Sequence, residues 1–243
     1  KEKLNSLTDC SRLLDELLNR KPNKSLPYVG ASAFSHKGGL HVSAVKKDPK
    51  TYEHIDPKTV GNHRNIIISN QAGRSNILSR LEVYGVKIDS KDKKVQKILD
   101  EVKEREFSGY SYDGADASFE LLANRLLGKV PEYLKVESYD VSVSKSDKIS
   151  TKATVVFVVD RKKIKGSGEG HGPVTALDNA LRNALIKYYP SLKKLNLVDY
   201  KVRILTPQDG TNALVRVRIE SSNHKYKWST IGVSYNVVDA SYI

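Results

Sequence analysis

An internal repeat in the second half of the chain limits the possible folds more than any other feature. The segment Tyr139-Asp-Val-Ser-Val143 is matched by Tyr200-Lys-Val-Arg-Ile204. The segment Ala153-Thr-Val-Val-Phe157 is matched by Ala213-Leu-Val-Arg-Val217. Apolar residues recur at every second position in these segments, as in a β-strand with one buried face. The matches predict two copies of one supersecondary unit, related by about 60 residues.

Each copy continues with a third strand, a glycine-containing turn and a helix. In the first copy these are Lys163–Glu169, Gly170–Pro173 and Val174–Tyr188. In the second copy they are Tyr226–Ser229, Ile231–Ser234 and a shorter helix within Asn236–Ile243. A proline suits the first position of a helix, so Pro173 supports the helix start in the first copy. The region therefore reads as two βββα units.

The first 130 residues have a different pattern, with short amphipathic helices and loops rich in glycine. We expect helices at Leu4–Arg20 (capped by Ser6 or Thr8), at 73–84, at 91–107 (capped by Ser90) and at 115–127 (capped by Asp113). A short strand is expected at Asn65–Ser69. The fold class is therefore α+β. The expected domains are a helical, loop-rich linker at residues 1–130 and a repeat domain at 131–243.

The chain is basic, with 41 Lys and Arg residues against 28 Asp and Glu and a net charge of +13. A basic nucleic-acid-binding module is one function class with this balance, and it stands as an alternative hypothesis. However, residues 1–130 carry a net charge of +6 and residues 131–243 one of +7. Nucleic-acid binders usually gather their positive charge on one stripe. An evenly spread excess favours a solvated lysine-rich surface, with no nucleic acid as partner.

Cysteine usage and hydropathy limit the compartment. The single cysteine, Cys10, excludes an internal disulfide, and we expect the reducing cytoplasm. The longest apolar run, Val155–Val159, is far shorter than the about 20 residues that a membrane-spanning helix needs. We therefore expect no membrane partner. The chain begins at Lys1 and contains no Met, so we expect a piece of a longer protein or a processed chain.

The glycine-containing turns are the first candidate binding site. Backbone N–H groups at the start of a helix lack intrahelical partners and attract a carboxylate. Two repeats placed back to back would combine such donors with aliphatic walls, which suits a small apolar amino acid. The alternative is that the glycines only turn the chain into the helix.

Four of the six histidines lie between residues 36 and 63 and form the second candidate site. His36 and His41 are five residues apart, which is not the spacing of two metal ligands on one helical face. A histidine in the glycine-rich loop Ser35–His41 is a candidate general acid or base. The alternative is that these histidines hold the loop by hydrogen bonds. We expect no metal site.

Six longer motifs are spread over nearly the whole chain, in order: 33–45 (AFSHKGGLHVSAV), 51–62, 73–77 (GRSNI), 113–122 (DGADASFELL), 170–177 and 228–234 (WSTIGVS). Together they resemble the isopropylmalate/citramalate synthase family of acetyl-CoA-dependent condensing enzymes. The first four resemble the linker of that family, and the last two resemble its C-terminal allosteric domain.

The resemblance implies a dimeric regulatory domain that follows a linker and an N-terminal TIM barrel. The barrel would hold a divalent metal and acetyl-CoA, so no cofactor is expected within these residues, and this chain alone is expected to be inactive. By resemblance, His36 reaches the neighbouring subunit's barrel and assists catalysis, and Tyr52 helps to position that site. The same resemblance assigns the effector pocket to Gly170, Gly172, Val174, Leu177, Gly232 and Val233. It also implies that Ile243 ends the last helix early.

The loop sequence His36-Lys-Gly-Gly-Leu-His41-Val-Ser-Ala is closer to the citramalate branch of the family than to the isopropylmalate branch. The citramalate branch implies pyruvate as substrate and isoleucine as effector. The isopropylmalate branch, which is the alternative, implies 2-oxoisovalerate and leucine.

Overall fold

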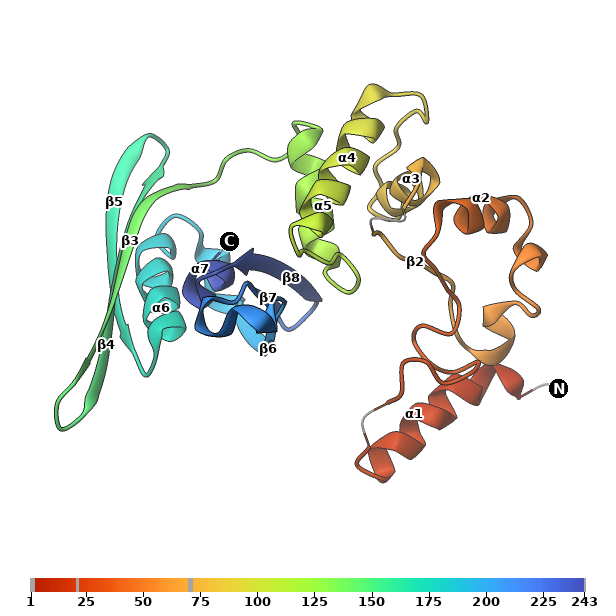
Figure 1. Cartoon of the computed structure of the whole chain (residues 1–243), viewed down its shortest axis with the longest axis horizontal. Helices are drawn as coiled ribbons and strands as arrows, with labels where there is room; N and C mark the ends of the chain where they lie inside the picture. The colour runs from red at the N-terminus through yellow and green to blue at the C-terminus, as the bar shows by residue number, and fades with distance from the viewer. Residues whose placement is uncertain (1–2, 21, 70–71, 243) are drawn as a thin grey trace. The chain divides into compact units, whose positions relative to one another are not determined.

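The computed structural model describes residues 3–20, 22–69 and 72–242, so the predicted early helix end at Ile243 lies outside the described residues. The chain divides into two compact units (Figure 1). Unit 1 comprises Lys1–Phe107 and Ser111–Asp113, and unit 2 comprises Ser108–Tyr110 and Gly114–Ile243. The predicted domain boundary at residue 130 falls inside unit 2, because helix α5 (Asp116–Leu126) packs on strand β8 of that unit.

Unit 1 is a set of short helices around one very small sheet. Its elements are η1 (Leu4–Ser6), α1 (Leu7–Leu17), β1 (Ser35–His36), α2 (Gly39–Lys47), η2 (Pro49–Thr51), η3 (Pro57–Val60), β2 (Asn65–Ile66), α3 (Arg74–Val83) and α4 (Lys93–Phe107). Strands β1 and β2 are parallel. The apolar stripe of α4, which includes Val95, Ile98 and Val102, is fully buried. The predicted strand at Asn65–Ser69 is only two residues long.

Several predicted helix caps are wrong. At α4, Asp92 accepts a hydrogen bond from the Lys94 N–H (2.8 Å), so the capping side chain is Asp92 and not Ser90. At α1, Ser6 occupies the cap position without a side-chain bond. Thr8 is buried and donates its hydroxyl proton to Val60 O (2.7 Å), which ties α1 to η3. Helix α5 begins at Asp116, and Ala115 before it makes no side-chain cap.

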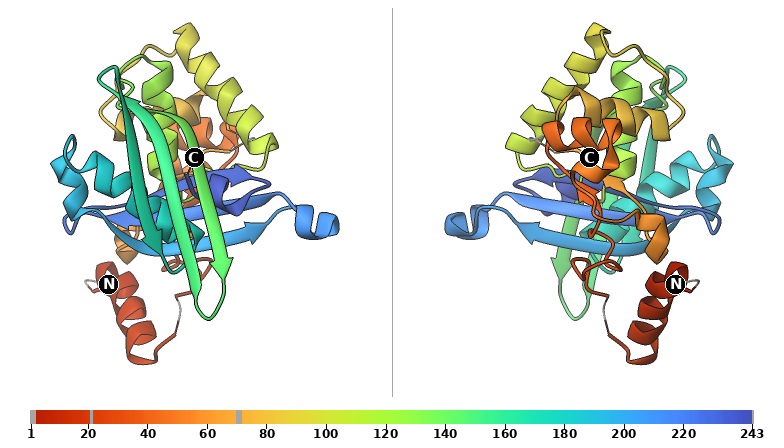
Figure 2. Two further views of the ribbon diagram at one scale, coloured as in Figure 1. Left: turned by 90° about the vertical axis from the view of Figure 1, so that its left-hand side faces the viewer. Right: turned by 90° about the vertical axis from the view of Figure 1, so that its right-hand side faces the viewer.

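Unit 2 contains two βββα repeats, which confirms the predicted α+β fold (Figure 2). The first repeat is β3 (Lys135–Lys145), β4 (Ile149–Val159), β5 (Lys162–Gly170) and α6 (Pro173–Leu185). The second is β6 (Asn196–Ile204), β7 (Val215–Ser222), β8 (Lys227–Ser234) and α7 (Val237–Tyr242). Short helices η4 (Pro190–Lys194) and η5 (Pro207–Asn212) lie in the connections. Each sheet is antiparallel with its strands in sequence order.

The number of residues between equivalent positions of the two repeats differs from the prediction from the second strand of each repeat onward. Ala153 pairs with Gly168 in the first sheet, and Val217 pairs with Gly232 in the second. Ala153 is therefore equivalent to Val217 and not to Ala213, which places the later strands 64 residues apart. The extra residues lie between β6 and β7, where the connection contains η5.

Helix α6 covers one face of the first sheet. Alternate residues of β4 face it and are buried, namely Ala153, Val155, Phe157 and Val159. Helix α7 lies between the two sheets, because it contacts both β8 and Tyr139 of β3. None of the helices in the described part of the chain is long and apolar enough to cross a membrane.

The far face of the second sheet is covered by the segment that leads into α5. Gly109 accepts a hydrogen bond from Arg216 Nε of β7 (2.7 Å). Gly114 lies against the guanidinium of Arg218, and both glycines have positive φ angles (+99° and +73°). The N–H of Ile231 in β8 donates to Ser118 Oγ of α5 (3.0 Å). These bonds attach to the second sheet a segment that precedes the first repeat in the sequence.

Candidate functional site

A buried carboxylate lies at the centre of the histidine-rich part of unit 1. The Glu53 side chain is 2% exposed and bonds both His36 and Arg64. His36 Nε2 lies 2.9 Å from Glu53 Oε1, and Arg64 Nε donates to the same oxygen at 2.7 Å. Arg64 Nη2 donates to Oε2 at 2.5 Å. Because an ionised carboxylate only accepts hydrogen bonds, His36 must carry its proton on Nε2.

Hydrogen bonds from Arg64 and, to a smaller extent, from His36 hold the pKa of Glu53 below its usual value, although burial opposes the shift. A carboxylate whose pKa is lower in the folded state stabilises the fold above its unfolded pKa. That contribution is lost as the pH falls through the folded pKa. We therefore expect the urea midpoint to fall more steeply below about pH 4.5 in the wild-type chain than in Glu53→Gln. Circular dichroism measures both curves, and parallel curves would contradict the assignment.

The two predicted catalytic residues do not meet. Tyr52 stacks on His41, with ring centroids 4.2 Å apart and an interplanar angle of 29°, whereas His36 is bonded to Glu53. Tyr52 is 47% exposed, and His41 in the first turn of α2 is also exposed. His41 and Tyr52 therefore both lie at the surface, whereas the His36 side chain is largely enclosed.

The start of α2, which carries His41, is fixed by a buried amide. Asn76 of α3 is fully buried, and its Nδ2 donates to Lys37 O (3.0 Å) and to Ile67 O (3.1 Å). Its Oδ1 accepts from the Gly73 N–H (3.1 Å). A Cβ on Gly39 would lie 2.8 Å from Gly73 N, so glycine is required where the two helix starts approach each other.

No cluster of three His, Cys, Asp or Glu side chains that could hold a metal ion occurs within residues 3–20, 22–69 and 72–242. The histidine-rich segment instead divides its side chains between the Glu53 cluster, the His41–Tyr52 stack and an edge contact of His54 with Tyr28 (5.5 Å between centroids).

The six predicted effector residues fall into separate places in unit 2. Gly170 ends β5, Gly172 is the N-cap of α6 and Val174 lies in the first turn of α6. Leu177 is 4% exposed and belongs to the core. Gly232 and Val233 lie within β8, so the predicted turn at Ile231–Ser234 is wrong.

The two residues in β8 face opposite ways. A Cβ on Gly232 would overlap Ala240 O of α7, whereas the Val233 side chain lies beside Gly109 on the other face of the sheet. The glycines of β5, like Gly232, lie where a helix backbone approaches the strand closely. A Cβ on Gly168 would lie 2.7 Å from Ala176 O of α6. These glycines thus let the helices approach the strands closely, which neither interpretation from sequence anticipated.

Two tyrosines at equivalent repeat positions hold α7, and sequence reasoning missed them as site residues. Tyr139 of β3 donates to Asp239 Oδ1 (3.2 Å), and Tyr200 of β6 shares a hydrogen bond with Ser241 Oγ (2.7 Å). Burial, together with the nearby Asp239 carboxylate, raises the pKa of the Tyr139 phenol. The repeated tyrosine was the available signal, since it begins both matching strand segments.

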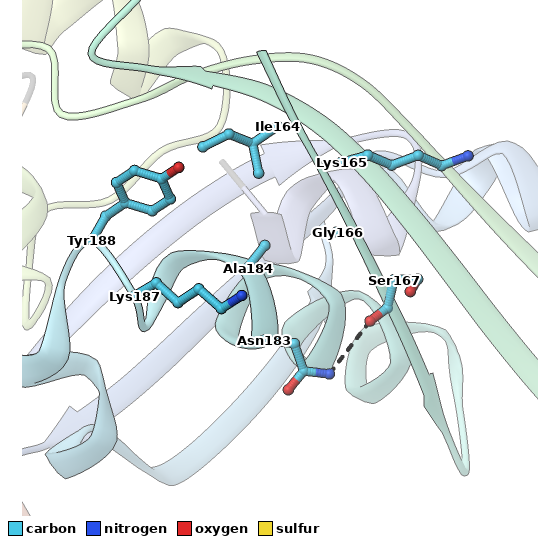
Figure 3. A pocket seen from close by; sticks show the side chains of 8 residues that line it. All are labelled: Ile164, Lys165, Gly166, Ser167, Asn183, Ala184, Lys187 and Tyr188. Carbon is cyan, nitrogen blue, oxygen red and sulfur yellow. Dashed lines mark hydrogen bonds between the residues drawn. The ribbon is translucent and has the colours of Figure 1, made fainter. Parts of the chain in front are cut away.

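A pocket of about 400 Å³ lies between the edge of β5 and the C-terminal half of α6. Figure 3 shows the side chains that line it. Asn183 of α6 donates to Ser167 O (3.4 Å) at its edge, and Asn179 donates to Glu169 O (2.8 Å) farther along β5. None of the predicted effector residues lines this pocket. The two asparagines thus donate hydrogen bonds to backbone carbonyl groups on the outer edge of the strand.

Two family models match the chain. The LeuA allosteric (dimerisation) domain matches residues 113–243. The homocitrate synthase post-HMGL domain-like family matches residues 28–108. The described folds of the two units agree with this division.

Similar proteins bear the name (R)-citramalate synthase. The protein from Aquifex aeolicus is 47% identical over 100% of this chain, and that from Geobacter sulfurreducens is 48% identical over 99%. The protein from Methanocaldococcus jannaschii is 31% identical over 90%. The chain spans about half the length of these relatives (46%, 46% and 43%). The resemblance to this enzyme family is therefore confirmed, and the chain belongs to the LeuA allosteric (dimerisation) domain family.

Proposed function

We propose that this chain is the linker and feedback-regulatory region of a citramalate synthase, in which unit 2 binds isoleucine and pairs with a second copy. The observation that carries the proposal is the match of residues 113–243 to the allosteric domain, combined with whole-chain similarity to (R)-citramalate synthases. The longer protein would condense acetyl-CoA with pyruvate in a barrel that holds a divalent metal.

The start of α6 offers donors for the carboxylate of an amino acid. Gly172 precedes the helix, and Pro173 occupies its first turn, so the N–H groups of the next residues lack intrahelical partners. The partial positive charge of a helix start favours an anion. Val174 in the same turn supplies an aliphatic surface beside these donors. We propose this end of α6 as the carboxylate end of the effector site.

In unit 1, the geometry supports His41 and Tyr52 as the pair that serves the condensation. An exposed imidazole stacked on an exposed phenol can take a proton from the acetyl methyl group or activate water. The sequence resemblance assigned His36 to catalysis. We propose instead that His36 supports this pair indirectly, through its hydrogen bond to Glu53. Tyr52 keeps its proposed role. This chain alone is expected to form no citramalate, because the proposal places acetyl-CoA and the metal in the barrel.

Isoleucine is expected to raise the melting temperature of the chain by about 5–10 °C at a hundredfold excess over its Kd. Calorimetry measures the affinity for isoleucine, leucine and valine, and light scattering should give about twice the 27.1 kDa chain mass. A response to leucine alone would favour the isopropylmalate branch. No response to any of the three would contradict the effector site.

A matched variant tests the location of the carboxylate end. Val174→Asp places a negative charge in the first turn of α6, which stabilises the helix but repels a carboxylate ligand. We expect the variant to melt at or above the wild-type temperature and to lose the response to isoleucine. An unchanged affinity for isoleucine would place the carboxylate elsewhere.

A further inference from the structure

We infer that Glu53 is the positioning residue that holds the segment carrying His41 against the segment carrying Tyr52. This inference rests on the proposed function of those two side chains and extends it to a buried group that does not itself reach the surface. Glu53 accepts hydrogen bonds from His36 and Arg64 and is 2% exposed. A buried carboxylate that loses its partners is strongly unfavourable, so these contacts resist separation.

The three residues of the cluster lie next to the segments that must be held. Glu53 directly follows Tyr52. His36 ends β1, and the helix that carries His41 begins three residues later at Gly39. Arg64 precedes β2, which pairs with β1 through Ser35 and His36. One carboxylate therefore joins the start of α2 to the segment of Tyr52, and Arg64 joins both to the small sheet.

The stacked rings do not hold this geometry by themselves, since both side chains are exposed. A ring contact of this kind is weak compared with the conformational entropy that two exposed side chains lose when they are held together. The order must come from the backbone beneath them. The Glu53 cluster supplies that order on the Tyr52 side, and Asn76, which bonds Lys37 O, supplies it on the α2 side.

The test is an NMR measurement on the chain as it stands. Stacking on Tyr52 shifts the ring protons of His41 upfield, and Tyr52→Leu gives their position without the stack. In Glu53→Gln, the amide has one acceptor oxygen instead of two and cannot accept all three hydrogen bonds from His36 and Arg64. We expect the His41 signals to move most of the way to the Tyr52→Leu positions. Glu82→Gln, a charge loss at an exposed site on α3, is the control and should leave them unchanged.

A second pair of variants keeps the test decisive if Glu53→Gln does not fold. His36→Gln retains a donor near the position of Nε2 and should preserve the His41 signals, whereas His36→Ala should displace them. Folded variants that lose the Glu53 contacts but keep the wild-type His41 signals would overturn the inference. A merely stabilising cluster would lower the melting temperature and leave the ring shifts of the folded molecules unchanged.

Kinetics of the longer enzyme separate this inference from the proposed function. We expect His36→Ala to lower kcat roughly 10- to 100-fold with little change in KM, and His36→Gln to restore most of it. Full activity in Tyr52→Leu would remove the proposed catalytic pair, while the NMR result would still decide whether Glu53 positions the two rings. Wild-type kcat in His36→Ala alongside an inactive Tyr52→Leu would overturn the positioning role alone.

Discussion

Gly168→Val is expected to unfold the first βββα repeat. A Cβ on Gly168 would overlap Ala180 N and lie 2.7 Å from Ala176 O, and both atoms belong to the backbone of α6. A helix backbone cannot turn aside as a side chain can, so α6 would have to leave the sheet. Its departure would expose Ala153, Val155 and Phe157, which are at most 2% exposed. We expect a loss of at least about 3 kcal/mol in the free energy of unfolding.

Urea unfolding followed by circular dichroism measures this loss. Gly172→Ala is the matched control, because nothing lies within 4 Å of a Cβ at that position, and it should change the stability by less than about 1 kcal/mol. Gly232→Val should also be destabilising, since its Cβ would overlap Ala240 O of α7. The effect should be smaller there, because α7 has 6 residues and α6 has 13. A wild-type midpoint for Gly168→Val would contradict the close packing of α6 on β5.

In the citramalate synthase proposed above, loss of the His41 imidazole is expected to lower kcat by roughly 10²- to 10⁴-fold, which is the usual contribution of a general acid or base. His41→Gln should not restore activity, because an amide is neither protonated nor deprotonated near neutral pH and cannot act as a general acid or base. His36→Gln should be well tolerated, since it retains a donor for Glu53. A loss of activity in His41→Gln together with retained activity in His36→Gln distinguishes a group that transfers a proton from a group that donates a fixed hydrogen bond.

Steady-state kinetics with pyruvate and acetyl-CoA provide the measurement, and circular dichroism confirms that each variant folds. Full activity in His41→Gln with complete loss in His36→Gln would reverse the assignment and restore the one that the sequence resemblance suggested. Wild-type activity in both variants would exclude this part of unit 1 from the chemistry.

The two repeats could be predicted from the sequence because the alternation of apolar residues in a strand and the recurring tyrosine are visible within a few consecutive residues. Their spacing could not, since the longer connection around η5 changes the offset only after the first strand. Gly232 was predicted in a turn because glycine usually marks one. Only the approach of α7 explains a glycine inside β8, and that approach is a tertiary contact.

Only some features of the candidate site in unit 1 could be predicted from the sequence. The sequence placed His36, His41 and Tyr52 in one functional segment, which the structure keeps within unit 1. It did not indicate that His36 would be enclosed, because that depends on the contacts of Glu53 with His36 and Arg64, which are 17 and 11 residues away in the sequence. The cap of α4 shows the same limit on a smaller scale, since Asp92 and Ser90 are both good capping residues and only the register of the helix chooses between them.

The attachment of Gly109 and Gly114 to the far face of the second sheet affects how unit 2 could be fused to other proteins. A fusion joined at residue 131 would leave behind α5 and the hydrogen-bond partners of Arg216 and Ile231. It would also uncover Val233, which lies beside Gly109 on that face and pairs with Arg216 of the neighbouring strand. A fusion joined upstream of Ser108 keeps the sheet together with the segment that covers it. The smallest transferable domain therefore begins well before the first strand of the repeat.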